Sequence, residues 1–225
     1  MSDLNKKVWD EIYDSGTQLN RYPYDSVVAF VYKNYPKNIE RKDIKILEVG
    51  CGAGNNLWFA AREGFNVTGV DRSKSAIEYA KKRFMDENLK GKFIAGDIKK
   101  LPFDDESFDL VIDRSALSCV NLNKCKLAVS EINRVLKRGG KFFFNPFSDK
   151  HSSCTSGEYR ADGMTEHIKE GISNVGNVSF YGKRDIYRLF QEKWQLGSIK
   201  HIEAVEQINP LYYVHAEWEI IATKL

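Results

Sequence analysis

The sequence predicts an α/β fold in which parallel strands alternate with helices. Short apolar runs of the kind seen in buried parallel strands alternate with segments that have the apolar spacing of amphipathic helices. The first run, residues 44–49, leads directly into a glycine turn and a helix, and the second run ends in Asp71. This order of strand, turn, helix, strand and acidic residue organises the rest of the chain.

The glycine turn marks a place where a ligand can approach the backbone. Gly50, Gly52 and Gly54 follow the first strand, and glycine permits positive φ angles and close contact with a bound group. A helix begins at Asn55 and ends near residue 63. Asp71 then stands at the tip of the neighbouring strand, within reach of a ribose bound over the turn. A turn that binds no ligand is the structural alternative.

Two cofactor classes use this layout, and the third glycine position separates them. A dinucleotide-binding turn has the pattern G-x-G-x-x-G, whose third glycine packs the helix against the strand. Asn55 stands at that position here, and Glu48 precedes the turn. The segment 47–54, LEVGCGAG, instead resembles the first motif of class I S-adenosylmethionine (SAM)-dependent methyltransferases. The resemblance implies that the turn runs next to the amino-acid part of SAM and that Asp71 binds the ribose hydroxyls.

The composition fits one domain of 225 residues, which is long enough to bury a full core. The 34 basic and 31 acidic residues give a formal net charge of +3 and are mixed along the chain, which argues against a nucleic-acid footprint. The four cysteines form no C-x-x-C pair, no apolar run reaches membrane-spanning length, and the N-terminus lacks a signal-peptide pattern. We therefore expect a cytoplasmic monomer or homodimer with free thiols and no membrane or nucleic-acid partner.

Residues 1–40 predict a helical lid over the cofactor. An amphipathic helix spans residues 2–16, an aromatic loop follows, and Pro23 opens a second helix over residues 24–35. In many SAM methyltransferases such a pair of helices covers the cofactor and shapes the acceptor pocket. By this resemblance Trp9, Tyr13, Tyr22 and Arg21 are candidate lid residues. The alternatives are a helix-core position for Trp9 and a surface loop for Arg21.

The third strand, residues 92–95, ends in a further motif of the same family. It follows a helix that Ser73 caps and that runs to about residue 88. Gly96, Asp97 and Ile98 come next. In the family the acid accepts a hydrogen bond from the exocyclic amine of adenine, and the next residue covers the adenine face. A turn cap is the alternative role for Asp97.

The fourth strand, residues 108–112, ends where the family places the reacting methyl group. Asp113, Arg114 and Ser115 follow it, and ligands of open parallel sheets bind outside the carboxyl ends of the strands. An ion pair between Asp113 and Arg114 that only fixes the loop is the alternative. Methyltransferases that act on nucleic-acid bases carry N-P-P-[FYW] at this point, whereas this chain has DRSA there. Its similar tripeptide, residues 145–147, follows the fifth strand, so a nucleic-acid substrate is not expected.

The family pattern breaks after the fifth strand. A helix over residues 124–136, closed by the glycines at 139 and 140, and a strand over residues 141–144 complete a cofactor core of residues 44–145. Residues 146–181 are rich in Ser, Gly and Asn and have little periodicity; such long irregular stretches are usually functional. We interpret them as the acceptor-binding insertion. His151 or Asp113 could take a proton from the nucleophile, although a surface-loop histidine is an alternative for His151.

Residues 182–225 predict a helix and a strand pair. The helix covers residues 183–192, and strands cover residues 194–205 and 211–223. By the resemblance the sheet is Rossmann-like and mostly parallel, with an antiparallel last strand and helices on both faces. His215 and Trp218 lie in that last strand and are expected to be sheet residues rather than catalytic ones.

The function that follows is methyl transfer from SAM, with S-adenosylhomocysteine (SAH) as product, to an oxygen or nitrogen of a small metabolite. The whole chain looks like bacterial small-molecule methyltransferases, some of surface-polysaccharide pathways, which suggests a sugar, nucleotide sugar, or phosphorylated or amino compound. The sequence shows no metal-ligand cluster. The alternatives are a nicotinamide-dependent oxidoreductase and a non-catalytic SAM-binding or partner-binding protein. The residues expected to bind the cofactor are Trp9, Tyr13, Tyr22, Gly50, Cys51, Gly52, Asn55, Asp71, Arg72, Ser73, Gly96, Asp97, Ile98, Asp113, Arg114 and Ser115.

Overall fold

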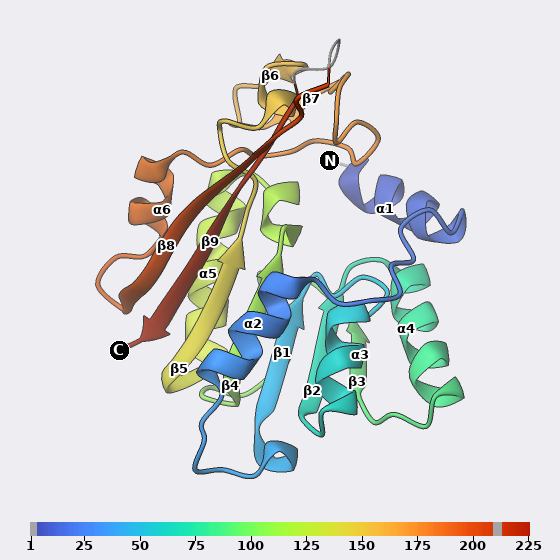
Figure 1. Cartoon of the computed structure of the whole chain (residues 1–225), viewed down its shortest axis with the longest axis vertical. Helices are drawn as coiled ribbons and strands as arrows, with labels where there is room; N and C mark the ends of the chain where they lie inside the picture. The colour runs from blue at the N-terminus through green and yellow to red at the C-terminus, as the bar shows by residue number, and fades with distance from the viewer. Residues whose placement is uncertain (1–3, 209–212) are drawn as a thin grey trace.

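The computed structural model describes residues 4–208 and 213–225, and its centre is a seven-stranded sheet with helices on both faces (Figure 1). The strand order is β3-β2-β1-β4-β5-β9-β8. The neighbours from β3 to β5 are parallel, whereas β9 runs antiparallel to both β5 and β8. The expected α/β class, with its mostly parallel sheet and antiparallel last strand, is confirmed.

The elements follow the predicted order along the chain. The strands of the large sheet are β1 (Lys45–Val49), β2 (Asn66–Asp71), β3 (Lys92–Ala95), β4 (Phe108–Arg114), β5 (Leu136–Asn145), β8 (Trp194–Val205) and β9 (Val214–Lys224). The α-helices are α1 (Leu4–Asp14), α2 (Asp25–Asn34), α3 (Asn55–Arg62), α4 (Lys74–Asp86), α5 (Leu122–Val135) and α6 (Lys183–Leu189). Short 3-10 turns are η1 (Arg41–Asp43), η2 (Ala116–Cys119) and η3 (Ser152–Cys154).

Two hydrophobic cores hold the layers together, one on each face of the sheet. Helices α2, α3 and α4 pack on one face, where Phe30 stacks on Phe143 of β5 with ring centroids 5.2 Å apart. Helices α5 and α6 pack on the other face, with Phe142 and Phe144 of the same strand. Successive side chains of β5 thus enter opposite cores, as the two-residue period of a strand requires.

The junction between α5 and β5 differs from the prediction. We expected a helix to residue 136 and a strand from residue 141, but α5 ends at Val135 and β5 begins at Leu136. Lys137 therefore lies in the strand, where its ammonium donates to Asp109 Oδ1 at 2.7 Å. A shift of register in the pairing of β4 with β5 accommodates the glycines that were expected to close the helix.

The segment after β5 lies above the carboxyl ends of the parallel strands, next to the far ends of β8 and β9 (Figure 1). It contains a two-stranded ribbon of β6 (Glu158–Tyr159) and β7 (Thr165–Glu166), which the sequence pattern did not predict. Its first residues pair with β9: Ser148 N donates to the carbonyl of Ala216 at 2.9 Å, and Trp218 N to that of Pro146 at 2.9 Å. The predicted strand over residues 211–223 begins at Val214 in the described part of the chain, and residues 211 and 212 lie outside it.

Candidate functional site

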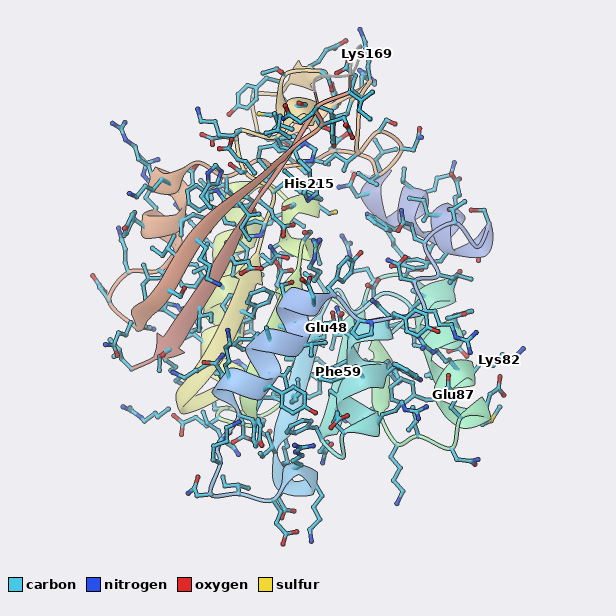
Figure 2. The ribbon with its side chains drawn as sticks, viewed as in Figure 1. Glu48, Phe59, Lys82, Glu87, Lys169 and His215 are labelled. Atoms are coloured by element: carbon cyan, nitrogen blue, oxygen red, sulfur yellow. The ribbon has the colours of Figure 1, made fainter. Side chains whose placement is uncertain are left out.

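A cavity of about 570 Å³ opens at the carboxyl ends of the parallel strands. The glycine turn and the ends of β2 and β4 form its floor, α1 forms one side, and the segment after β5 and β9 form its upper wall. Figure 2 shows Glu48 at the sheet and His215 above it, beneath the segment that follows β5. The site thus lies where ligands of open α/β sheets bind.

Most of the predicted cofactor residues meet in this cavity. Those that line it are Trp9, Tyr13, Gly50, Cys51, Gly52, Asn55, Asp71, Arg72, Ser73, Ile98, Arg114 and Ser115. The lining does not include Tyr22, Gly96, Asp97, Asp113 or His151. Lining residues that the sequence analysis did not select include Asn5, Lys6, Gln18, Asn20, Tyr24, Glu48, Phe147 and His215.

The glycine turn leaves no room for side chains. Gly50 and Gly52 have φ angles of +67° and +49°, and a Cβ added at Gly50 would overlap the methyl group of Ala116. A Cβ at Gly52 would overlap the hydroxyl group of Tyr13, which reaches the turn from α1. The turn therefore requires glycine both for its backbone and for close approach.

Asp71 is fixed at the edge of this turn. Its carboxylate accepts hydrogen bonds from Gly52 N at 2.9 Å and Ser73 N at 2.8 Å. Burial raises the pKa of this carboxyl, although the two backbone N–H groups act in the opposite direction. The side chain is thus rigid and lines the cavity, as an acceptor for ribose hydroxyls requires.

The first helix, which belongs to the expected lid, forms one side of the cavity. Trp9 and Tyr13 line the cavity with ring centroids 5.8 Å apart. Asn5 Nδ2 donates to the carbonyls of Cys119 at 2.7 Å and Asn177 at 2.9 Å, and Asn5 Oδ1 accepts from Asn177 N at 2.9 Å. One side chain of α1 therefore ties the helix to both η2 and the segment after β5.

Two predicted contacts lie outside the cavity. The side chain of Tyr22 is exposed and packs edge-on against Trp58. The carboxylate of Asp97 forms an ion pair with Lys99 at 2.8 Å and caps its backbone N–H at 3.0 Å, which is the turn-cap role. Ile98 does line the cavity, and its side chain offers the apolar surface expected for an adenine.

Two buried carboxyl groups lie beneath the cavity. Glu48 is 2% exposed and accepts from Asn56 Nδ2 at 2.7 Å, while its other oxygen has no partner in the described part of the chain. Asp113 is completely buried and accepts from Leu117 N at 2.9 Å, so it supports η2 instead of facing the cavity. Burial raises the pKa of Glu48 to about 8 and that of Asp113 to about 7.

A connected set of polar side chains joins the end of β4 to the upper wall. Arg114 Nη2 lies 3.3 Å from Glu217 Oε2, and its guanidinium carbon lies 4.2 Å from the ring centroid of Tyr24. Glu217 also contacts His215 Nε2 at 3.3 Å. The partner of Arg114 is therefore Glu217, and not the neighbouring Asp113 that the loop-fixing alternative required.

His151 lies behind this wall instead of in it. Its side chain is 1% exposed, and its Nε2 lies 3.3 Å from His215 Nδ1. It is His215, which we had expected to be a sheet residue only, that lines the cavity. The two-residue spacing of His215 and Glu217 on one face of β9 was the available signal, but the sequence does not show which end of the strand meets the cavity.

The lining fits the methyl donor of the resembled family. The glycine turn excludes side chains, Asp71 offers a fixed carboxylate and Ile98 offers an apolar surface, while Glu48, which also belongs to the lining, has a buried carboxyl oxygen without a partner among the described residues. SAM carries an adenosyl group, an ammonium group and a positively charged sulfur, and when bound it supplies an activated methyl group. Among the described residues, a potential metal cluster of Glu158, Glu166 and His167 lies outside the cavity lining.

The chain was compared with families and curated proteins of known sequence. Residues 46–140 match the family model described as methyltransferase domain. The phthiotriol/phenolphthiotriol dimycocerosates methyltransferase of Mycobacterium tuberculosis is 36% identical over 120 residues, which are 52% of this chain and 42% of the relative. Methyltransferase GfsG of Streptomyces halstedii is 25% identical over 93% of this chain and 80% of the relative. The chain thus spans less than half of the mycobacterial relative.

Solved structures share the fold over nearly the full length. A SAM-dependent methyltransferase from Methanosarcina mazei has a TM-score of 0.69 at 21% identity and covers 91% of this chain and 99% of its own. The [4+2]-cyclase SpnF has a TM-score of 0.71 at 14% identity and covers 100% of this chain and 96% of its own. None of the helices in residues 4–208 and 213–225 has the length and apolar character needed to cross a membrane. Residues 46–140 thus match a methyltransferase domain, and the strand order of the sheet is that of the fold that the solved structures share.

Proposed function

We propose that this protein transfers the methyl group of SAM to an oxygen or nitrogen of a small metabolite. The observation that carries the proposal is that two groups of residues line one cavity. The glycine turn, Asp71 and Ile98 suit the donor. Phe147 and His215, from the segment after β5 and from β9, line the same cavity, and we assign them to a second molecule. In-line methyl transfer requires that donor and acceptor share one site.

The segment of residues 146–181 is the acceptor-binding part of this proposal, and residues 1–40 are its lid. Phe147, Ile172 and Val175 of the segment contribute apolar lining, while Lys6 and Asn20 contribute polar groups from the N-terminal side. Mixed lining of this kind suits a metabolite with both a polar and an apolar part, such as a sugar derivative or a phosphorylated or amino compound. The four free cysteines are compatible with the reducing cytoplasm that we expect for such an enzyme.

The name of the mycobacterial relative points to a lipid acceptor for that protein. The match covers 42% of the relative, so the part of it that would hold a lipid need not have a counterpart here. We therefore propose the small polar acceptor for this chain, with sugars and nucleotide sugars of a surface-polysaccharide pathway as the first compounds to test, and treat a lipid as an outcome of the acceptor screen.

A protein that binds SAM without methylating is the second candidate. The likeness to the cyclase SpnF supports this second candidate, because the name of that protein shows that the same fold can host a ring-forming reaction. Calorimetric titration with SAM, SAH and NAD separates the possibilities at the first step. We expect micromolar binding of SAM and SAH and none of NAD; binding of NAD, or of none of the three, would contradict the assignment of the cavity floor.

The second step measures turnover. Candidate acceptors, in the order sugars, nucleotide sugars, small amines and lipids, are incubated with SAM, and SAH release is followed with the Asp71→Ala variant as the inactive control. SAH release with one acceptor class supports methyl transfer and identifies the class. SAM binding without turnover on any of them supports the non-catalytic candidate.

A further inference from the structure

The hydrogen-bond partners of His215, in the upper wall, and of His151, behind it, determine how the two rings are oriented. His151 Nδ1 accepts the backbone N–H of Ser153 at 3.1 Å, so the proton of a neutral His151 must lie on Nε2. Burial, and then the neighbouring His215, lower the pKa of His151 to about 4, which keeps the ring neutral at pH 7. Its Nε2–H then points to His215 Nδ1 at 3.3 Å and to the hydroxyl oxygen of Tyr213 at 3.2 Å.

This arrangement leaves His151 without an available lone pair. One ring nitrogen carries the proton, and the other is bound to the backbone of its own loop. The side chain is also 1% exposed, so a substrate cannot reach it. The structure therefore favours a positioning role for His151 over the proton-accepting role expected from its sequence position.

His215 differs from His151 because its side chain lines the cavity. Its Nε2 lies 3.3 Å from Glu217 Oε2, and a carboxylate accepts the proton of that nitrogen, which leaves the lone pair on Nδ1, where His151 Nε2 is a partner at 3.3 Å. Although burial opposes it, the hydrogen bond from His215 and the charge of Arg114 hold the pKa of Glu217 below its ordinary value, so Glu217 stays ionised. The His215 side chain is 38% exposed and lines the cavity.

We propose that His215 is the general base of the reaction and that the acceptor is therefore a hydroxyl compound. A neutral amine attacks a sulfonium methyl group without prior loss of a proton, whereas an alcohol needs a base. The acceptor oxygen forms its bond to the methyl carbon as the carbon–sulfur bond breaks and the electron pair stays on sulfur. The hydroxyl proton moves to His215 Nδ1, and Glu217 stabilises the imidazolium that results.

The surroundings of His215 support this role. Phe147 lies edge-on to the ring, with centroids 6.0 Å apart and planes at 90°, and gives an apolar boundary to the place where the proton moves. Glu217 is itself held by Arg114, so the dyad has a fixed rotamer on a sheet strand. In the proposed complex, the hydroxyl group of the acceptor donates to His215 Nδ1, either together with His151 Nε2 or in its place.

This inference rests on the proposed methyl transfer, and its test separates the two. In the 225-residue chain, SAH affinity is measured by calorimetry for the wild type, His215→Ala and the control Tyr187→Ala, which changes an exposed aromatic side chain on α6, away from the cavity. All three should bind SAH equally. With the acceptor found in the screen, His215→Ala should lose about 10²- to 10⁴-fold in kcat, while Tyr187→Ala stays within about twofold. Added imidazole should restore part of the lost rate, because a small base can occupy the vacated space.

Long-range ¹H–¹⁵N spectra of the histidine-labelled protein bound to SAH test the geometry without any acceptor. We expect four histidine patterns, with the Nε2 proton present on both His151 and His215. In Glu217→Gln, the fixed tautomer of His215 should give way to a mixture, and kcat should fall at least about tenfold with little change in KM. A proton on His215 Nδ1 in the wild type, or full turnover by His215→Ala with SAH binding intact, would overturn the proposal. Loss of SAH binding by the wild type would instead overturn the methyl-transfer function beneath it.

Discussion

Replacing Glu48 by glutamine should change how the stability of the ligand-free protein depends on pH. Glu48 is 2% exposed, and burial raises its pKa from its ordinary value of 4.5 to about 8. Because the folded state holds this proton more tightly than the unfolded chain does, the protonated carboxyl stabilises the fold fully below pH 4.5. That stability is lost as the pH rises toward 8.

The size of the effect follows from the difference between the two pKa values. That difference corresponds to at most about 5 kcal/mol, because one pKa unit equals about 1.36 kcal/mol. Relaxation of the site around the ionised group reduces the figure, so we expect about 2 to 4 kcal/mol. The glutamine side chain of the Glu48→Gln variant keeps an oxygen for Asn56 Nδ2 but adds an unpartnered amide N–H, which costs about 1 to 3 kcal/mol at every pH.

Urea unfolding of the wild type and Glu48→Gln at pH 5, 7 and 9 measures this difference. The stability of the variant relative to the wild type should rise by about 2 to 4 kcal/mol between pH 5 and pH 9. Asp113, whose pKa is raised to about 7, is present in both proteins. Glu78→Gln, at an exposed site on α4, is the control and should show no such trend. A constant difference between Glu48→Gln and the wild type at all three pH values would refute the reasoning.

Three further predictions concern the cavity. Asp71→Ala should weaken SAH binding about 10²-fold, because the ribose would lose two charge-assisted hydrogen bonds. Asp97→Ala should weaken SAH binding less than about fivefold, because Lys99 holds the Asp97 carboxylate. Calorimetry checks both, and equal losses would contradict the placement of Asp71 at the ribose. Gly52→Ala should weaken SAH binding at least about tenfold, because the new methyl group overlaps the hydroxyl group of Tyr13. The double variant Gly52→Ala with Tyr13→Phe should recover part of the lost affinity. Purely additive effects of the two substitutions on affinity would argue against the contact. Asn5→Ala should speed proteolysis of the N-terminal helices and weaken SAH binding about threefold to tenfold, because it removes the hydrogen bonds that hold α1. Lys7→Ala, at an exposed position of the same helix, should do neither. Identical digestion of the two variants would contradict the role of Asn5 in holding α1.

Some of the residues that line the cavity lie close together in the sequence, and their arrangement could be predicted. The glycine turn and Asp71 belong to one βαβ unit of less than thirty residues, so their relative positions follow from the unit alone. Ser73 was expected to cap α4 and does so, since its side chain accepts from Ala76 N at 3.2 Å. Local chemistry of this kind, a positive φ or an unpaired backbone N–H, is visible in single residues.

The upper wall could not be predicted in the same way. Glu217 meets Arg114 from a strand about a hundred residues later, and the contact depends on the register in which β9 pairs with β5. A shift of that register by one residue would turn His215 and Glu217 to the other face of the sheet. Sequence position alone favoured His151, because it lies closer along the chain to the end of β5.

Even a residue in the right motif can be directed elsewhere by its neighbours. Asp97 stands where the family has its adenine-binding acid, but Lys99, two residues later, pairs with the carboxylate outside the cavity. Short-range patterns were enough to predict the α/β class and the glycine turn followed by Asp71, because both depend on residues that lie close together along the chain. The sequence could not show that His215 lines the cavity, or that Asn5 ties α1 to Asn177, because these contacts join segments that are far apart in the chain.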